Sequence, residues 1–228
     1  MALDTPDIRS AKKIIQTLKG DVKTYKVGNE LFTAHGPKAV QMVREAGARV
    51  FLDLKYHDIP NTVASAARQA VSLGVFMFNV HASGGLQMMQ EAVIATADEA
   101  KKKNIPAPKL IAVTLLTSLN QEEVTKQIGI SKSIDETVLH YAALAQKAGL
   151  DGVVASAREV EKIRAKVGPG FLIVTPGIRP AWAERGDQER IMTPKEALRL
   201  GADYLVIGRP ITQAEDPRDA VKRIFTEL

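Results

Sequence analysis

Short apolar runs alternate with longer helical patterns along the chain, and this alternation limits the folds that the sequence can adopt. Runs with the length and composition of strands lie at 23–28, 49–54, 76–81, 109–115, 152–155, 171–175 and 203–207, with the tail of an earlier strand expected at 2–4. Helical patterns occupy 7–19, 36–46, 61–73, 85–103, 134–148, 157–167, 194–200 and 216–226. Such alternation is typical of a parallel sheet built from βα units.

Two arrangements of βα units compete, a closed barrel and an open doubly wound sheet. No Gly-x-Gly-x-x-Gly follows the first strand, which removes the main signature of the dinucleotide-binding open sheet. Eight units at the observed spacing fill the 228 residues without a linker. We therefore expect one domain over 1–228, a single (β/α)8 TIM barrel of the α/β class, with its chemistry at the carboxyl ends of the strands.

Composition restricts the location and chemistry of the chain. There is no cysteine, which excludes disulfides, thiolate catalysis and Cys-ligated zinc and permits a reducing compartment. No apolar run approaches the roughly 18–20 residues that span a bilayer, and the beginning of the chain lacks the apolar segment of a signal peptide. We therefore expect a cytoplasmic protein that does not bind membranes.

The charge balance favours an anionic partner. The net charge is +5, from 31 Lys+Arg against 26 Asp+Glu, which suits a nucleic acid, a membrane surface or a phosphorylated metabolite. The basic block 101–103 ends a helical pattern, where cations interact favourably with the helix dipole. Aromatic residues are 5% and are not interleaved with basic ones. We expect no nucleic-acid binding, and a nucleic-acid-binding protein is kept as the non-enzyme alternative.

The most informative segment is 53–62, which closes the strand at 49–54. Asp53 and Lys55 are two residues apart and share one face of a strand, so both are expected to point into the barrel mouth, with Asp58 following in the loop. An ammonium flanked by carboxylates keeps its proton. It is a poor nucleophile, but it stabilises a developing anion and then donates a proton. The alternative is a structural salt bridge at the rim, although three charges ending one buried strand are costly to keep for structure alone.

The last two predicted strands end in sequences that suit a phosphate group. Gly208 allows close approach of the backbone, and Arg209 supplies a bidentate fork. In barrels, phosphate often binds at the loops that follow these strands. The strand expected at 171–175 leads into 178–192, a basic connection that is longer than ordinary βα loops. We interpret this connection as a lid that closes on the ligand. The alternative for Gly208 and Arg209 is a turn glycine followed by a surface arginine. The alternative for 178–192 is a surface loop without a role in binding.

Weaker signals come from other strand ends. Thr117 and Ser118 offer hydroxyls either to the polar edge of a ligand or to the following turn. Lys26 either joins the charge network or extends toward solvent on its own. Asp4 either holds a sugar hydroxyl or caps the following helix. The four histidines show no metal spacing, and no nucleophile elbow or Walker loop is present. We expect no metal and no cofactor.

Together, these motifs resemble the orotidine 5′-phosphate decarboxylase family. The resemblance rests on 53–62, 79–85, 175–179 and 206–210, with 26–28 and 3–4 also fitting in the right order, and it covers essentially the whole chain. It implies a cofactor-free decarboxylation of orotidine 5′-monophosphate to UMP, the last step of pyrimidine nucleotide synthesis. Loss of CO2 from this substrate leaves a vinyl carbanion with little resonance help, and a preorganised ammonium beside C6 is what such a transition state needs.

The resemblance also implies a role for each catalytic candidate. Lys55 would be the proton donor to C6, and Asp53 would face the substrate carboxylate. Lys26 and Asp58 would complete an alternating charge array. The second aspartate would come from the neighbouring subunit, so the implied active form is a homodimer with shared sites. The neighbouring subunit would also supply Ile59 and Thr62.

The resemblance also implies the remaining contacts. Asp4 would bind the sugar, Thr117 and Ser118 would bind the pyrimidine edge, and Pro176 would pack near the base. The lid and phosphate contacts would come from Arg179, Gln188, Gly208 and Arg209. The first strand of the family is longer than the three residues that precede Asp4, so this strand is expected to be very short or trimmed. The nearest enzyme alternative is a metal-dependent sugar-phosphate decarboxylase or aldolase of the same barrel group. It would add carboxylate ligands for Mg²⁺, and no Asp or Glu ends the strands from 76–81 onward.

Overall fold

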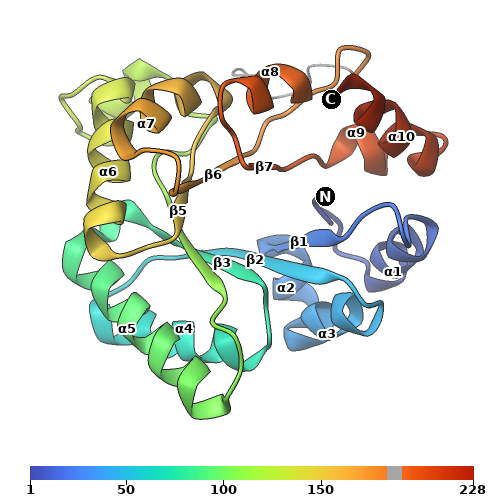
Figure 1. Cartoon of the computed structure of the whole chain (residues 1–228), viewed down its shortest axis with the longest axis horizontal. Coiled ribbons are helices and arrows are strands. Elements are labelled where there is room, and N and C mark those ends of the chain that lie inside the picture. Colours follow the sequence, from blue (N-terminus) through green and yellow to red (C-terminus); the bar gives the residue numbers. More distant parts are fainter. Residues whose placement is uncertain (184–191) are drawn as a thin grey trace.

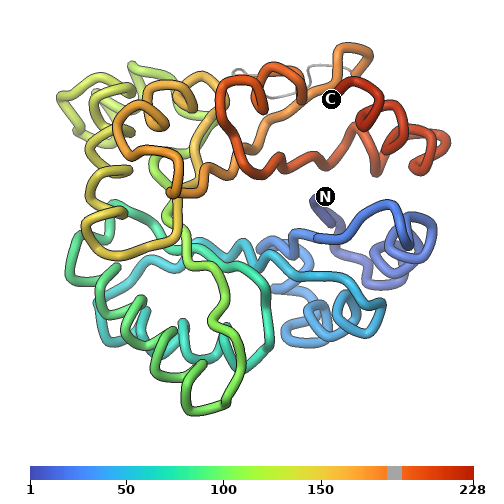
Figure 2. Tube along the Cα trace, in the orientation of Figure 1, coloured from blue at the N-terminus to red at the C-terminus, as the bar shows by residue number. Residues whose placement is uncertain are grey.

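The computed structural model describes residues 1–183 and 192–228. Seven parallel strands lie in one sheet in chain order: β1 (Thr24–Gly28), β2 (Arg49–Tyr56), β3 (Met77–His81), β4 (Lys109–Val113), β5 (Gly152–Val154), β6 (Leu172–Thr175) and β7 (Tyr204–Leu205). Parallel neighbours require crossover connections, and helices supply them. The sheet curls around one interior with the helices outside, so that β1 and β7 face each other (Figures 1 and 2). The predicted parallel α/β architecture is thus confirmed.

The described residues contain ten α-helices, eight of which lie on the helical patterns of the sequence. They are α1 (Ile8–Thr17), α2 (Asn29–His35), α3 (Pro37–Glu45), α4 (Pro60–Ser72), α5 (Gly85–Lys103), α6 (Ile134–Ala148), α7 (Val160–Val167), α8 (Pro194–Arg199), α9 (Arg209–Thr212) and α10 (Pro217–Glu227). Short helical turns lie at η1 (Ala82–Gly84), η2 (Glu123–Gln127) and η3 (Ala157–Glu159). Capping boxes start α6 and α8, where Ser133 and Thr193 exchange hydrogen bonds with the glutamate three residues on. Among the described residues, no helix combines the length and apolar character needed to cross a membrane.

The strand expected at 2–4 is present only as a single bridge. Ala2 pairs with Lys26 in parallel. The Ala2 amide donates to the Ile207 carbonyl at 2.8 Å, and the Leu3 amide donates to the Lys26 carbonyl at 3.0 Å. Residues 1–3 therefore bond to β1 on one side and to the segment after β7 on the other. The described residues contain seven strands, and the expected first strand is reduced to this bridge, because one residue pair does not make a ladder.

Strand alternation sorts the apolar residues into two clusters. The larger one, which includes Leu52 and Phe78, lies between the sheet and the helices. The smaller one fills the interior of the curled sheet and consists of Phe51, Met77, Ile111, Val113, Val154 and Val174. Side chains two residues apart on a strand share a face, so Asp53 follows Phe51 and Asn79 follows Met77 on the interior side. The interior core therefore leads directly into polar side chains at the carboxyl ends of the strands.

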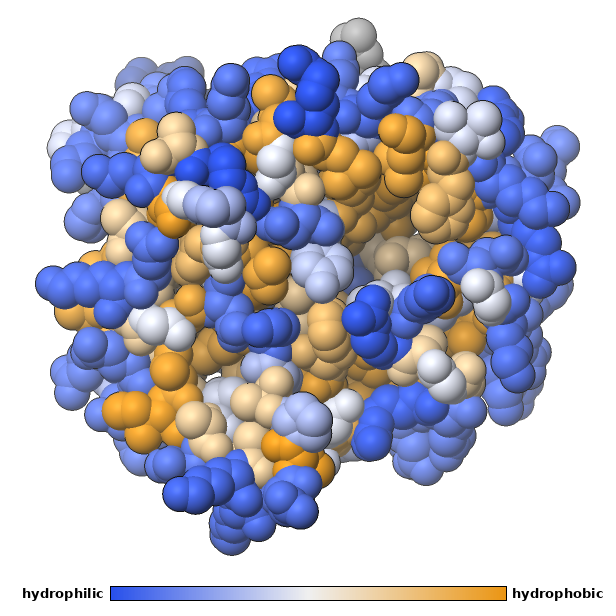
Figure 3. Space-filling model, viewed as in Figure 1, coloured by the Kyte–Doolittle hydropathy of each residue, from blue (hydrophilic) through white to orange (hydrophobic). Residues whose placement is uncertain are grey.

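The amino ends of the strands present a different surface. Apolar side chains from the C-terminal helices gather around a hollow beside the N-terminal segment (Figure 3). Leu198, Phe225 and Leu228 line this hollow and are among the exposed large apolar residues. The two ends of the sheet thus differ in chemistry, and the predicted functional residues belong to the carboxyl end.

Candidate active site

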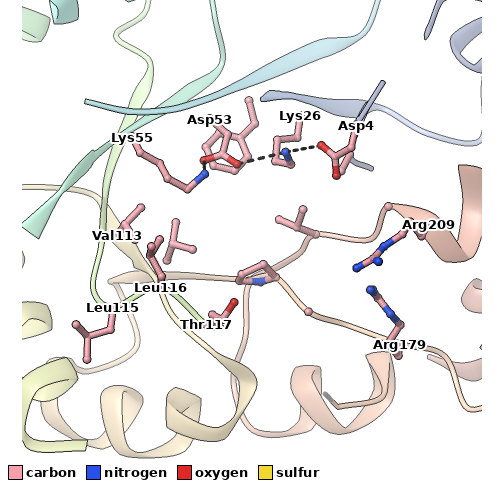
Figure 4. Close-up of a pocket in the computed structure, with 17 residues that line it drawn as sticks. Asp4, Lys26, Asp53, Lys55, Val113, Leu115, Leu116, Thr117, Arg179 and Arg209 are labelled. Atoms are coloured by element: carbon pink, nitrogen blue, oxygen red, sulfur yellow. Dashed lines mark hydrogen bonds and ion pairs between the residues drawn. The ribbon is translucent and has the colours of Figure 1, made fainter. Parts of the chain in front are cut away.

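A pocket of about 240 Å³ opens at the carboxyl ends of the strands. Part of its apolar lining comes from the interior cluster and the residues packed against it: Phe51, Val113, Val154 and Val206. Its polar lining comes from strand ends and the following loops: Asp4, Lys26, Asp53, Lys55, Thr117, Arg179 and Arg209 (Figure 4). The pocket lies where the barrel prediction placed the chemistry.

Asp53 is the centre of an array of alternating charges. Its Oδ1 accepts a hydrogen bond from Lys55 Nζ at 2.7 Å, and its Oδ2 lies 3.3 Å from Lys26 Nζ. Lys26 Nζ is in turn 2.9 Å from Asp4 Oδ1. The four side chains form a row along one wall of the pocket (Figure 4). Each ammonium of the array therefore lies beside at least one carboxylate.

Burial and charge act in opposite directions on this array. Burial alone would raise the pKa of Asp53, but Lys26 and Lys55, with hydrogen bonds from Lys55 and Asn79, outweigh burial and hold that pKa below its usual value. Burial likewise would lower the pKa of Lys26, and the carboxylates of Asp53 and Asp4 outweigh it and raise that pKa. Both groups therefore remain charged at neutral pH in a poorly solvated setting, which prepares an electric field before any ligand arrives.

The carboxylates of the array are paired with lysines. Asp4 and Asp53 lie on either side of Lys26, and both are in contact with its Nζ. Within residues 1–183 and 192–228, no three His, Cys, Asp or Glu side chains gather in a way that could hold a metal ion. The arrangement is thus an ion-pair chain in the part of the protein that the structure describes.

Lys55 has an unusual backbone conformation. Its φ is 54°, in the left-handed region that non-glycine residues seldom adopt. The register between β2 and β3 shifts at the same place, because Leu52 pairs with Phe78 whereas Tyr56 pairs with Val80. Strand β2 therefore bulges between Leu52 and Tyr56. The regular alternation from which the sequence predicted a shared face does not extend to Lys55, although Asp53 and Lys55 both line the pocket.

Two arginines lie across the pocket from the array, toward its Asp4 end. Arg179 and Arg209 come from the loops after β6 and β7, and their guanidinium groups point toward one another (Figure 4). A Cβ at Gly208 would lie 3.3 Å from Asp4 Oδ2, so glycine lets this loop pass close to the array. Two adjacent guanidinium groups suit a bidentate anion such as a phosphate.

The structure brings most of the predicted site residues together, but not all. The residues that line the pocket are Asp4, Lys26, Asp53, Lys55, Thr117, Pro176, Arg179, Gly208 and Arg209. The predicted residues that are exposed and do not line it are Asp58, Ile59, Thr62 and Ser118. Asp58 Oδ1 accepts the backbone amide of Ile59 at 2.6 Å, just before α4. Gln188 and most of the predicted lid at 178–192 lie outside the described residues.

Asn79 is a site residue that the sequence analysis did not identify. It is fully buried on β3, its Nδ2 donates to Asp53 Oδ1 at 2.7 Å, and its Oδ1 accepts the Lys55 amide at 2.8 Å. The sequence feature that could have identified Asn79 is a single amide side chain among the apolar residues of a strand. A buried polar group needs hydrogen-bond partners, so it points to polar neighbours in the interior.

Comparison with known proteins relates the whole chain to one family. Residues 1–224 match the family described as "Orotidine 5'-phosphate decarboxylase / HUMPS family". A relative from Moorella thermoacetica named orotidine 5′-phosphate decarboxylase is 57% identical over 228 residues, which cover 100% of this chain and 90% of the relative. One of the same name from Geobacter sulfurreducens is 52% identical over 227 residues, with 100% and 94% covered. The crystal structure of the Lactobacillus acidophilus enzyme of that name aligns with a TM-score of 0.86 at 39% identity, covering 99% of this chain and 96% of that one.

Proposed function

Because the chain belongs to the orotidine 5′-phosphate decarboxylase / HUMPS family, we propose that its Asp–Lys array carries out the family's reaction. That reaction is the decarboxylation of orotidine 5′-monophosphate to UMP in pyrimidine biosynthesis, as the sequence motifs implied. The observation that carries the proposal is the Lys55 ammonium, which lines the pocket 2.7 Å from the Asp53 carboxylate.

Lys55 is the proton donor in this mechanism. The bond between C6 and the carboxylate breaks, CO2 leaves, and the electron pair stays on C6 as a carbanion. The ammonium stabilises the growing negative charge and then transfers a proton from Nζ to C6, which gives UMP. Solvent later returns a proton to the lysine. Because Asp53 already holds Nζ before the substrate binds, little reorganisation accompanies the reaction.

Asp53 and its other neighbours prepare the site for the substrate. Asp53 faces the substrate carboxylate and stays ionised because Lys26 and Lys55 lower its pKa. Lys26 links Asp53 to Asp4, and Asp4 binds a hydroxyl of the ribose. The array thus spans the distance from the reacting carbon toward the sugar.

The opposite wall binds the rest of the nucleotide. Arg179 and Arg209 hold the phosphate, and Gly208 brings the backbone close to it, which agrees with the paired guanidinium groups in Figure 4. Gln188 adds a contact from the lid at 178–192. Contacts to the pyrimidine come from Thr117 and Pro176, which line the pocket, and from the neighbouring Ser118, which is exposed in this structure. Phosphate contacts made far from C6 provide binding energy for closure and orientation, so the reaction needs no cofactor in this proposal.

The active form that we propose is a homodimer with shared sites. Asp58 does not line the pocket of its own chain, and it lies beside Ile59, which is 67% exposed just before α4. A carboxylate from a second copy would extend the array beyond Lys55. Ile59 and Thr62 would enter the partner's pocket together with Asp58. An exposed large aliphatic side chain beside an exposed acid suits such an interface.

The proposal includes a closed eight-stranded barrel in the cytoplasm. Closure is supported by residues 1–3, which bond to Lys26 on one side and to Ile207 on the other. A cytoplasmic location suits an enzyme of nucleotide biosynthesis and a chain with no cysteine.

The direct test of the reaction is the ultraviolet absorbance of orotidine 5′-monophosphate mixed with the purified protein in EDTA. We expect rapid loss of the orotate chromophore without added metal. No change with protein shown to be folded, followed by recovery on addition of Mg²⁺, would instead support a metal-dependent reaction.

The shared site is tested by mixing two inactive variants, Lys55→Ala and Asp58→Ala. In a hybrid dimer, the Asp58→Ala subunit keeps its own Lys55 and receives Asp58 from its partner. Random exchange of subunits therefore restores about a quarter of the wild-type activity. Absence of recovery, with subunit exchange demonstrated by mass spectrometry of labelled chains, would contradict shared sites.

A further inference from the structure

The backbone at Lys55 adopts a conformation that costs free energy. A left-handed φ at a residue with a Cβ is held only where the surroundings enforce it, and it costs about 1–3 kcal/mol. The φ of 54° at Lys55 is one of two positive φ values among the described residues other than glycine. The other is Asn104, which caps the end of α5 and is of a residue type that tolerates this region. Lys55 therefore calls for an explanation of what holds it.

The bulge at Lys55 also removes backbone partners. Between the pairs Leu52–Phe78 and Tyr56–Val80, β2 contains three residues and β3 contains one. The single residue on β3 is Asn79. Its side chain takes the place of the interrupted ladder, because its Oδ1 accepts the Lys55 amide at 2.8 Å. A partly buried amide of the bulge is thereby satisfied without returning Lys55 to the regular strand.

The same side chain also holds the carboxylate. Asn79 Nδ2 donates to Asp53 Oδ1 at 2.7 Å, and the same oxygen accepts from Lys55 Nζ at 2.7 Å. The Lys55 amide needs an acceptor and the Asp53 carboxylate accepts donors, and the two ends of the Asn79 primary amide serve both at once. The backbone of Lys55, Asn79, Asp53 and the Lys55 ammonium thus form a closed hydrogen-bonded ring.

We propose that Asn79 is a positioning residue that fixes the Lys55 ammonium relative to Asp53 by holding the strained backbone of one and the carboxylate of the other. It touches no reacting atom. Its effect is to reduce the freedom of Nζ before the substrate binds, and misplacement of about 1 Å at such a group costs on the order of 10²-fold in rate. The inference rests on the proposed role of Lys55 as proton donor.

The first test is Asn79→Ala, measured by steady-state turnover of orotidine 5′-monophosphate. We expect kcat to fall by about 10²-fold and KM to change by less than about threefold, because the phosphate contacts are untouched. The matched control is Thr96→Val. Thr96 is also buried, at 4% exposed, and its hydroxyl donates to the Ala92 carbonyl at 2.7 Å within α5, away from the pocket. This control should keep the wild-type kcat.

The second test is Asn79→Asp, which has the same shape and still accepts the Lys55 amide. Its other oxygen faces Asp53 Oδ1, and two carboxylates in contact stay close only if they share a proton. The ratio of the variant's kcat to the wild-type kcat should therefore be highest at the acid end of the pH range and should fall as pH rises. For Asn79→Ala the same ratio should not depend on pH.

These measurements separate a positioning role from a structural one. If Asn79 only supports folding, both variants unfold at lower temperature, but kcat per folded molecule stays at the wild-type value and the ratio for Asn79→Asp is flat. That result would overturn the inference. If Asn79→Ala does not fold, the pH dependence of Asn79→Asp decides alone. Wild type and Lys55→Ala run in the same assay, and activity retained by Lys55→Ala would contradict the proposed function instead.

Discussion

The protein has a lysine–aspartate ion pair at each end of its sheet, and the two pairs have the same length in different surroundings. Lys55 Nζ lies 2.7 Å from Asp53 Oδ1 at the carboxyl end, and Lys109 Nζ lies 2.7 Å from Asp151 Oδ1 at the amino end. The Asp53 side chain is 12% exposed and the Asp151 side chain 33%. Asp53 also contacts a second lysine and Asn79. The distance alone does not distinguish the two pairs.

The amino-end pair is one of two similar structural devices. Asp151 precedes β5, and its Oδ2 accepts the Leu110 amide of β4 at 2.8 Å. Asp203 precedes β7, and its Oδ2 accepts the Ile173 amide of β6 at 2.7 Å and pairs with Arg164 at 2.7 Å. In both cases, an aspartate before one strand binds the beginning of the strand before it. Such pairs hold neighbouring strands in register. The array around Asp53 instead gathers charged side chains at a pocket, where their electric field acts on a bound ligand.

The largest expected effect separates the two lysines. Lys55→Ala should lower kcat/KM by about 10⁴-fold or more, because in the proposed mechanism it removes both the proton donor and the cation beside C6. Lys109→Ala removes a pair of equal length but should leave turnover unchanged and cost less than about 1 kcal/mol of stability. The absorbance assay and urea unfolding measure the two quantities. A Lys55→Ala enzyme within tenfold of wild type would end the proton-donor role.

A second contrast compares arginines at the two ends. Arg209→Ala should reduce kcat/KM by about 10–100-fold, since a charge-assisted contact to phosphate contributes about 1.5–3 kcal/mol. Arg164 donates to the carbonyls of Gly168, Phe171 and Gly201 as well as to Asp203. Arg164→Ala should therefore lower the free energy of unfolding by about 3 kcal/mol and leave kcat/KM of the folded enzyme unchanged. Unchanged kinetics in Arg209→Ala would place the phosphate elsewhere.

The smallest expected effect concerns pH. Burial, together with the nearby His57 and Lys55, lowers the pKa of His81 to about 4. His81 is thus neutral in the folded protein at pH 5, whereas an unfolded histidine, with a pKa of about 6.5, binds a proton there. The free energy of unfolding should therefore fall as pH drops from about 6.5 toward about 4. Denaturant unfolding at several pH values should show a smaller fall for His81→Gln than for wild type. An identical slope in both proteins would argue against a neutral His81.

Much of the fold was predictable because its signals are local. Periodicity and termination residues placed α5 and α6 at 85–103 and 134–148, as observed. The short helices α2 and α9 were not predicted. The strand expected at 2–4 reduces to one bridge because its extent depends on partners in β1 and after β7, which no local pattern reveals.

The site was predictable where side-chain type alone indicates chemistry, as at Asp53 and Lys55. Its geometry was not, because the bulge at Lys55 depends on the side chain of Asn79, which is 24 residues away in the chain. Asp58 shows the same limit. Nothing local distinguishes a carboxylate that completes its own pocket from one that faces away from it, and the structure shows that it does not line its own pocket.

The interior cluster of the sheet is also part of the pocket wall, because Phe51, Val113 and Val154 belong to both. Pocket depth and core packing are therefore one property of this molecule. Enlarging the pocket for a bulkier ring means truncating a core residue, and a cavity of that kind costs about 2–5 kcal/mol. A variant with a widened pocket would therefore be less stable and less abundant in the cell. Selection for folding thus also preserves the shape of the pocket and, with it, the range of substrates.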